Sequence, residues 1–360
     1  MQKQLKILHI APMNTSGVPG QFVLAERQLG FKSRLVTLYR DKRNYFEDIC
    51  LDLPFIDFSP VRWIKKIVSS PEKMRVDNKL RIPKKIPLSW QPHSKAEEIL
   101  VHLRDSLWKK KIGRAIEKYN LANFDVYQLD GGLGFFRNAS FISVMKERGK
   151  KIICCYTGSD LRTRGVIPAI DQMSNLNVTV EFDHTLLHPN IHHIFFPFNA
   201  EKYRLRLKSH GDKIRIGHAP TSWKAKGSDI IVPVLKDLER EYAVEAVLIE
   251  NLSYKKALEL KRTCDIFVDQ IGDLGYGMNS LESLTMGIPT CSCLAPGFAE
   301  AYPDHPFVEI DAKNLKQELI RLITDVSLRQ ELSQRGRIWV LDHHNAVKSV
   351  KKIHELAGIE

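Results

Sequence analysis

The stretch TCDIFVDQIGDLGYGMNSLESLTMGIP, residues 263–289, determines the fold that we expect for the whole chain. Its apolar residues 266–268 predict a buried strand, and the glycines that follow predict a turn. The segment after Gly277 predicts a helix that carries Glu282 in its first turn. Glycines let a ligand approach the backbone, and the free N–H groups of a helix N-terminus favour negative charge. We therefore expect this stretch to bind a phosphorylated ligand.

Length and charge limit the class of protein. With 360 residues the chain is too long for one core, so we expect two domains. The hydrophobic content of 43% and the charged content of 27% are ordinary for a globular protein. The net charge of +12 indicates an anionic partner. A nucleotide phosphate, a polyanionic acceptor, nucleic acid and an acidic membrane surface all fit this charge.

The sequence contains no pattern that predicts export or a membrane span. The first residues have too short an apolar run for a secretory signal, and no run of about 18 apolar residues occurs. The six cysteines include no CxxC pair, so we expect reduced thiols that act mostly as small core residues. These features predict a cytoplasmic protein.

The first half of the chain alternates strand-like and helix-like segments, as in a Rossmann-like parallel sheet. Strands are predicted at 6–10, 31–38, 126–129 and 151–156, helices at 21–29 and 139–148, and one or two helices at 96–119. Ligands of such sheets bind at the carboxyl ends of the strands. The candidate contacts at this edge are Gly17, Asp130, Asp160 and Arg162. Ordinary turn chemistry, with Asp as a cap and Gly as a turn residue, is the alternative.

A basic insertion at 62–90 interrupts this half. Nine lysines and arginines between Arg62 and Lys85 stand against two carboxylates, with Trp63 and Trp90 among or beside them. Basic residues mixed with tryptophan suit an anionic membrane surface, where the rings lie at the level of the headgroups. A solvated basic face is the alternative.

A group of histidines raises the question of a metal site. The group consists of His184, His188, His192 and His193. Pro189 interrupts any helix that would align them, and no cysteine is near. We therefore predict no metal site here.

The second half repeats the alternating pattern. Strands are predicted at 214–217, 244–249, 266–268 and 290–293, and helices at 228–239, 255–262 and 315–356. Ser228 is the expected cap of the first of these helices. Two successive arrays of this kind predict two Rossmann-like domains that face each other across a cleft.

Five motifs stand out along the chain, and they are HAPT…KGSD at 218–229, CDIFVDQ at 264–270, GYGxxxxE…MGIP at 275–289 and, more loosely, FDVYQLDGG at 124–132 and YTGSDLR at 156–162. They resemble the motifs of the GT-B-fold nucleotide-sugar glycosyltransferases of group 1, or family 4. The resemblance implies an acceptor domain at 1–198 and a donor domain at 199–342. It also implies a C-terminal helix at 343–360 that crosses back to the N-terminal domain.

The resemblance further implies roles for individual residues. Lys226 matches the lysine that neutralises the donor diphosphate, and Glu282 matches the glutamate that holds the ribose hydroxyls. A capping box with Asn279 is the alternative role for Glu282. The other donor-side positions are Gly17, His218, Lys224, Tyr276, Gly277, Met278 and Asn279. The catalytic positions are Lys226, Asp160 and Asp273, and the acceptor-side positions are Asp130 and Arg162.

The chain departs from this family at two points. Leu274 stands where the first glutamate of the E-x7-E pattern is expected, and Asp273 replaces that glutamate only if the loop shifts its register. The arginine expected shortly before Lys226 is absent, and Lys224 lacks the bidentate fork of an arginine. A catalytically weak scaffold that binds a sugar nucleotide or a partner protein is therefore the second hypothesis.

The first hypothesis is a metal-independent hexosyltransferase of cell-envelope polysaccharide or glycoconjugate synthesis. By resemblance it would move a sugar from a UDP- or GDP-sugar to a glycan or lipid-linked acceptor, with retention and without a cofactor. We expect a cytoplasmic location, peripheral on the inner membrane face if the basic insertion binds lipid. A sugar-nucleotide epimerase on the same fold is an enzymatic alternative. Binding to nucleic acid is not expected, because no motif for it appears.

Overall fold

The computed structural model describes residues 4–41, 43–54, 87–92, 94–207, 212–272 and 275–359. Most of the basic insertion at 62–90, and Asp273 with Leu274, lie outside these described residues. The chain forms two compact units. The first is Met1–Ile194 with Ser349–Glu360, and the second is Phe195–Lys348.

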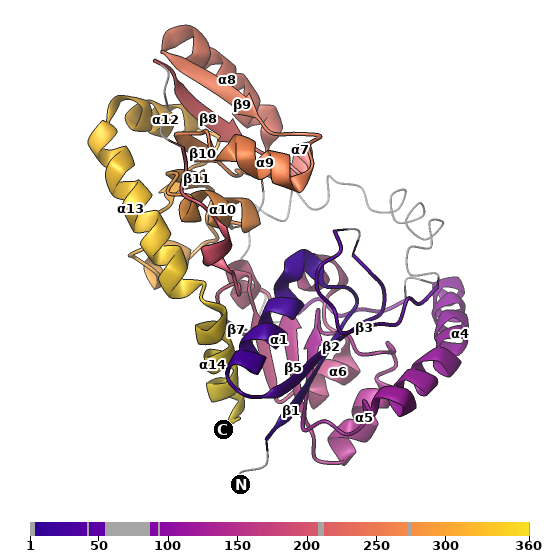
Figure 1. Cartoon of the computed structure of the whole chain (residues 1–360). Helices are drawn as coiled ribbons and strands as arrows, with labels where there is room; N and C mark the ends of the chain where they lie inside the picture. Colours follow the sequence, from indigo (N-terminus) through magenta and orange to yellow (C-terminus); the bar gives the residue numbers. More distant parts are fainter. Residues whose placement is uncertain are drawn as a thin grey trace. The chain divides into compact units, whose positions relative to one another are not determined.

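The first unit is built on a parallel sheet with the strand order β3-β2-β1-β4-β5-β6-β7 (Figure 1). Its strands are β1 (Lys6–Ala11), β2 (Lys32–Thr37), β3 (Ile49–Cys50), β4 (Val126–Asp130), β5 (Lys151–Tyr156), β6 (Leu176–Thr179) and β7 (His192–His193). The chain adds β2 and β3 on one side of β1 and continues with β4 on the other side. The order therefore reverses between β1 and β4, which is the position where open α/β sheets bind ligands.

The helices of the first unit come from both ends of the chain. They are α1 (Val18–Gln28), α4 (Lys95–Tyr119), α5 (Ser140–Glu147), α6 (Pro168–Met173) and α14 (Ala346–Ala357). The segment predicted as one or two helices at 96–119 is the single helix α4. Trp108 and Ile112 of this helix are buried, whereas the equally periodic Leu103 and Leu107 are 58% and 61% exposed.

Helices cover both faces of this sheet, so the side chains on both faces of its strands are mostly buried and apolar, as expected for parallel strands. Cys154 and Cys155 are therefore both buried, although consecutive side chains of a strand point to opposite faces. All six cysteines are free thiols. Trp90, for which contact with a membrane surface was one of two alternatives, packs against the core of this unit, and the Arg137 guanidinium lies 4.7 Å from its ring centroid.

The second unit has a smaller parallel sheet with the order β12-β11-β10-β8-β9. Its strands are β8 (Ile214–His218), β9 (Val244–Leu248), β10 (Ile266–Val268), β11 (Thr290–Ser292) and β12 (Val308–Glu309). Its helices are α7 (Trp223–Lys226), α8 (Ser228–Glu241), α9 (Tyr254–Lys261), α10 (Met278–Thr285), α11 (Phe298–Ala301), α12 (Leu315–Thr324) and α13 (Val326–His343). The predicted helix at 315–356 is thus three helices.

Ser228 does not cap α8, in contrast to the prediction from the sequence. Gly227 takes the cap position in the left-handed region, with φ 68°, and Ser228 is the first helical residue. The Ser228 hydroxyl is instead 2.8 Å from His218 Nε2. Ser228 therefore helps to hold α8 against β8 and does not cap the helix.

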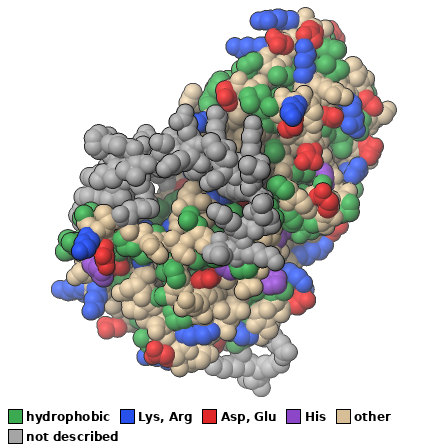
Figure 2. Space-filling model, turned by 180° about the vertical axis from the view of Figure 1, so that it is seen from behind, with side chains coloured by type: hydrophobic (Ala, Val, Ile, Leu, Met, Phe, Trp, Pro, Cys, Tyr) green, Lys and Arg blue, Asp and Glu red, His purple; other side chains and the backbone are tan. Residues whose placement is uncertain are grey.

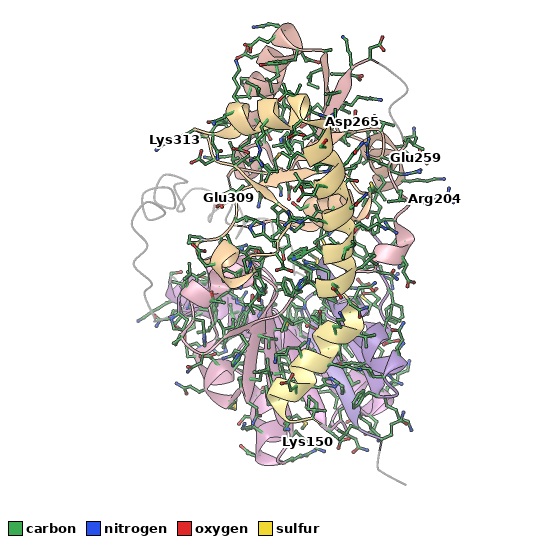
Figure 3. All side chains as sticks on the ribbon, turned by 90° about the vertical axis from the view of Figure 1, so that its left-hand side faces the viewer. Lys150, Arg204, Glu259, Asp265, Glu309 and Lys313 are labelled. Atoms are coloured by element: carbon green, nitrogen blue, oxygen red, sulfur yellow. The ribbon has the colours of Figure 1, made fainter. Side chains whose placement is uncertain are left out.

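Charged side chains lie mainly on the outside of the second unit. Glu259, Glu309 and Lys313 extend outward from it in Figure 3. On the face shown in Figure 2, basic and acidic side chains of this unit are interspersed. Among the described residues, no helix has the length and apolar character needed to cross a bilayer.

Candidate functional site

The carboxyl edge of the second sheet is organised by Asp269, the first residue after β10. Its carboxylate is buried, and Oδ1 lies 2.9 Å from Lys226 Nζ. Oδ2 accepts hydrogen bonds from Ser280 Oγ at 2.6 Å and from the Gly277 backbone N–H at 3.2 Å. Burial alone would raise the pKa of Asp269, but Lys226 and these two donors outweigh it and lower the pKa. A buried carboxylate thus joins the predicted lysine to the first turn of α10.

Lys226 reaches this carboxylate from the end of the short helix α7. Its ammonium also donates to Gln270 Oε1 at 2.8 Å, and its side chain is 13% exposed. A Cβ placed on Gly277 would lie 3.8 Å from Lys226 Nζ. The structure therefore places Lys226 close to Gly277, the residue that precedes α10. Lys224, on the same short helix, is exposed.

An ammonium group has three N–H donors, and two of those of Lys226 are used by Asp269 and Gln270. The third has no partner among the residues that the structure describes. It lies beside Gly277 and the amino end of α10, where backbone N–H groups and the helix dipole favour negative charge. The arrangement can hold an anionic group such as a phosphate.

Glu282 is held by partners that the sequence did not reveal. It lies in the second turn of α10, not in the first, and its side chain is 6% exposed. Tyr254 OH donates to Oε1 at 2.8 Å, and Lys261 Nζ donates to Oε2 at 2.5 Å. Both carboxylate oxygens are therefore engaged within the second unit.

The capping box considered for Asn279 and Glu282 does not form. Gly277 is the N-cap residue of α10, earlier in the chain than the pattern required. Asn279 instead donates to the Ala219 carbonyl at 2.9 Å and accepts from Lys261 Nζ at 2.7 Å. Asn279 thus ties α10 to the loop that follows β8.

Lys261 is the main residue of this site that sequence reasoning missed. It is 1% exposed, and its ammonium lies 4.8 Å from the ring centroid of Phe267 in addition to its bonds to Asn279 and Glu282. A buried lysine normally requires such a partner. In the sequence it is one of three lysines on the same helix, so no local signal distinguished it.

Two other predicted donor-side residues point into the core of the second unit. His218 Nδ1 lies 2.9 Å from the Val268 carbonyl and Nε2 lies 2.8 Å from Ser228 Oγ. Burial lowers the pKa of His218, so the ring is neutral, with Nδ1 as donor and Nε2 as acceptor. The Tyr276 ring stacks on Phe307 with centroids 4.6 Å apart. Both residues shape the site without presenting a polar atom to it.

The predicted residues of the first unit stabilise its loops. Asp160 accepts from the N–H groups of Gly158 and Leu161 at 2.9 and 2.8 Å and from the Thr157 N–H at 2.8 Å. Its carboxylate would lie 3.4 Å from a Cβ on Gly131, so the loops after β4 and β5 are neighbours. The Asp160 carboxylate is therefore occupied by its own turn, which is the alternative that the sequence left open.

Arg162 and Asp130 are likewise held by buried partners. Arg162 binds Asp183 through Nε at 2.7 Å and Glu181 through a terminal nitrogen, also at 2.7 Å. These pairs outweigh burial and raise the pKa of Arg162, whereas burial raises the pKa of Glu181 to about 7. Asp130 lies 3.0 Å from His9 Nδ1 and accepts from Gln128 Nε2, also at 3.0 Å.

Gly17 adopts the left-handed conformation that the loop after β1 requires. Its φ is 77°, and it caps the amino end of α1, so a side chain at this position would be strained. A Cβ here would lie 3.5 Å from the Tyr45 ring. The loop therefore needs glycine for its own geometry, whatever it binds.

No group of three or more histidine, cysteine or carboxylate side chains in the described part of the chain is placed to hold a metal ion. His184 lies 2.7 Å from Thr179 Oγ1 and 3.0 Å from the Gly158 carbonyl. His188 lies 3.1 Å from Asp171. These histidines hold loops of the first unit together.

The two parallel-sheet units give the chain the α/β fold of the GT-B glycosyltransferases. It is similar to sucrose-phosphate synthase from Thermosynechococcus elongatus, with 12% identity, 98% of each chain covered and a TM-score of 0.59. It is also similar to HepE from Anabaena, in a structure with UDP and glucose, with 11% identity, 99% of this chain and 100% of that chain covered and a TM-score of 0.55.

A third similar structure is a candidate UDP-N-acetylglucosamine 2-epimerase from Listeria monocytogenes. The identity is 13%, the alignment covers 98% of this chain and 95% of that chain, and the TM-score is 0.52. No protein-family model and no curated protein matches the sequence. The likeness is therefore one of fold.

Proposed function

We propose that the chain transfers a sugar from a nucleoside-diphosphate sugar to an acceptor. The observation that carries this proposal is the position of the Lys226 ammonium beside Gly277 and the amino end of α10. One N–H donor of this ammonium has no partner among the described residues, and the ammonium lies near the backbone N–H groups at the amino end of α10. The diphosphate is the part of a sugar nucleotide that an ammonium and a helix N-terminus would bind.

The proposed chemistry depends on charge stabilisation. As the bond between the sugar and the diphosphate breaks, negative charge grows on the departing oxygen. A lysine and a helix N-terminus that are already fixed in position stabilise this charge without further reorganisation. Asp269 supplies that fixation, since it binds both Lys226 and the Gly277 N–H. In this proposal no metal ion takes part.

Structural neighbours support a uridine nucleotide as the first ligand to test. The HepE structures from Anabaena contain UDP, UDP with glucose, or UDP-glucose. The motif resemblance supports retention of configuration and a glycan or lipid-linked acceptor. These finer assignments belong to the proposal and are tested by analysis of the product formed from UDP-glucose.

Calorimetric titration with UDP and GDP tests the donor site. We expect saturable binding of one nucleotide, and Lys226→Ala should weaken it about tenfold or more, since the lost ion contact is partly buried. The control is Lys236→Ala, which removes the same charge from an exposed position on α8. The proposal would be contradicted if neither UDP nor GDP bound, or if the two variants bound the nucleotide with equal affinity.

A second candidate function is binding of a sugar nucleotide without transfer. Two observations favour it: both oxygens of Glu282 are already engaged, and Leu274 replaces the expected glutamate. A turnover assay with a panel of sugar nucleotides separates the two functions, because a scaffold binds but releases no nucleoside diphosphate. Conversion of the donor to its epimer without an acceptor would instead indicate an epimerase.

A further inference from the structure

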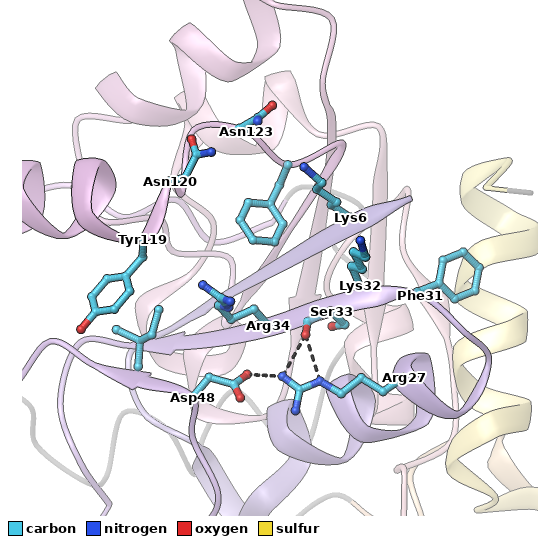
Figure 4. A pocket seen from close by; sticks show the side chains of 12 residues that line it. Lys6, Arg27, Phe31, Lys32, Ser33, Arg34, Asp48, Tyr119, Asn120 and Asn123 are labelled. Carbon is cyan, nitrogen blue, oxygen red and sulfur yellow. Dashed lines mark hydrogen bonds and ion pairs between the residues drawn. The ribbon is translucent and has the colours of Figure 1, made fainter. Parts of the chain in front are cut away.

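A pocket of about 680 Å³ lies at the amino-terminal edge of the sheet in the first unit. Lys6 and Lys32 are the first residues of β1 and β2. The rest of the wall comes from α1, from β2 and the residue before it, from the start of β3 and the residue before it, and from the end of α4 and the loop that follows (Figure 4). This edge is opposite to the carboxyl ends that carry Asp130 and Gly131. We call it the basic pocket, and its size is in the range of small-molecule sites.

The charged residues of the basic pocket are mostly cationic. They are Lys6, Arg27, Lys32, Arg34 and Asp48. Lys6 is the register partner of Lys32 in the parallel pair β1–β2, and Leu8 is the partner of Arg34. Residues two apart on a strand share a face, so all three cations of the two strands lie on one face of the sheet. Like charges on neighbouring strands repel, which costs stability unless another charge compensates them.

Asp48 is the one carboxylate among the described lining residues, and it is already engaged. Asp48 accepts from an Arg27 terminal nitrogen at 2.6 Å and from the Leu35 N–H at 2.8 Å, as the dashed lines of Figure 4 show for the arginine. The side chains of Lys6, Lys32 and Arg34 have no hydrogen bond or ion pair with any residue that the structure describes. Three cations therefore line the pocket without a compensating anion from the described chain.

The opposite wall offers groups that suit a hydroxylated ring. Asn120, which ends α4 with φ 52°, and Asn123 each carry an amide with donors and an acceptor. Tyr119 adds a hydroxyl and an aromatic face, and Phe124 adds a second ring. A ligand with an anionic group at one end and a polyol ring at the other would satisfy both walls.

We propose that the basic pocket binds a phosphorylated sugar, with its phosphate held by Lys6, Lys32 and Arg34. Arginine binds phosphate with two parallel N–H bonds, and lysine adds point charge, so phosphate fits this set well. The asparagines and the Tyr119 hydroxyl contact the sugar hydroxyls. The site is separate from the proposed donor site and does not depend on it.

Titration of the full chain with glucose 6-phosphate tests this assignment, with inorganic phosphate and glucose as separate arms. We expect glucose 6-phosphate to bind saturably and more tightly than phosphate alone, and glucose not to bind measurably. The double variant Lys32→Ala/Arg34→Ala should weaken binding about tenfold or more. The matched control is Lys109→Ala/Lys110→Ala on α4, which removes the same charge from exposed positions and should keep the affinity.

Two further measurements distinguish a ligand-binding role of these cations from a structural one. Lys226→Ala should leave the affinity for glucose 6-phosphate unchanged, because the donor site is elsewhere. Without ligand, Lys32→Ala/Arg34→Ala should unfold at the same or a higher temperature than the parent, since it relieves repulsion, whereas a purely structural role would lower that temperature. Absence of saturable binding, equal weakening by the α4 control, or equal affinity for inorganic phosphate would overturn the assignment.

Discussion

Both carboxylate oxygens of Glu282, the residue proposed to bind the ribose, already accept hydrogen bonds from neighbouring side chains. Tyr254 OH takes one oxygen and Lys261 the other, and the Tyr254 hydroxyl lies 2.8 Å from that of Tyr203. Tyr254 is 56% exposed, so its side chain can rotate away from Glu282 without disturbing the core. Lys261 is buried and cannot. A ribose diol that binds Glu282 would therefore replace Tyr254 and not Lys261.

Tyr254→Phe tests this competition. The variant keeps the ring but frees Glu282 Oε1, so UDP binding should tighten about threefold, the worth of one modest hydrogen bond. Tyr203→Phe is the control, because it leaves the bond between Tyr254 and Glu282 in place. Both affinities are measured by calorimetric titration. Weaker binding by Tyr254→Phe would show that the phenol assists the ligand and does not compete with it.

Lys261 should matter for stability more than any exposed lysine. Lys261→Met keeps the length of the side chain but leaves Glu282 buried without its cation, which typically costs about 3 kcal/mol in the free energy of unfolding. The double variant Lys261→Met/Glu282→Gln removes both charges and should recover much of that loss. Urea unfolding of the three proteins measures the effect. Equal stabilities of the parent and the single variant would contradict the role given to this ion pair.

At the scale of elements, α14 is joined to β1 and α1 by a buried polar network. His9 on β1 lies 3.1 Å from Glu26 on α1, and Glu26 lies 3.3 Å from His354 on α14. Burial alone would lower the pKa of His9, but Glu26 and Asp130 outweigh it and raise the pKa to about 10. Burial would raise the pKa of Glu26, but His9 and His354 outweigh it and lower the pKa.

This network makes stability depend on pH in a stated direction. A histidine whose pKa is raised on folding contributes stability that is complete below its ordinary pKa of 6.5 and is lost as the pH rises toward about 10. The midpoint of thermal unfolding should therefore fall between pH 6.5 and 10, and His9→Asn, although less stable overall, should show a smaller fall. Parallel curves for the two proteins would contradict the assignment of a charged His9.

The sequence predicted strands that form a distinct apolar run and missed several that do not. Strands β1, β5 and β10 were predicted within a residue, because each is a run of apolar residues that is buried in the structure. Strands β3, β7 and β12 have two residues each, and only their neighbours in the sheet define them. No period can be recognised in two residues.

The site could be predicted only in part for a related reason. Lys226 and Gly277 were predicted together because the motifs that contain them resemble those of one family, in which both positions lie on the donor side. The roles of Asp269 and Lys261 depend on contacts between residues far apart in sequence, which composition and spacing do not contain. The predicted capping box is wrong because α10 begins two residues earlier than expected, with Gly277 and not Asn279 at the N-cap position.

At the scale of the molecule, the first unit is completed by a segment that follows the second unit in the sequence. Residues 349–360 belong to the first unit, although residues 195–348 form the second. Phe31 and His354 pack edge to face with centroids 4.7 Å apart, and Lys151 donates to the Ala357 carbonyl at 2.5 Å. Val350 and Ile353 of α14 are buried.

Val350→Ala/Ile353→Ala should therefore destabilise the first unit. Truncation of two buried side chains of this size costs about 4 kcal/mol in total, because it removes apolar contacts and leaves a cavity. Lys351→Ala/Lys352→Ala is the control on the exposed side of the same helix. Hydrogen exchange of β1 and α1 reports the effect. Equal protection in the two variants would contradict the role of α14 in this unit.

The position of α14 also affects how the chain is made. During translation, the strands of the first sheet, which lie within residues 6–193, emerge well before α14, which covers part of the surface of this unit. At a synthesis rate of about 5–20 residues per second, the 154 residues between the two parts of the first unit take roughly 8–30 s. Over that time the apolar surface that later contacts Val350 and Ile353 is uncovered. Ribosome-bound chains stalled near residue 300 should therefore be cleaved by protease within the first unit faster than the released full chain.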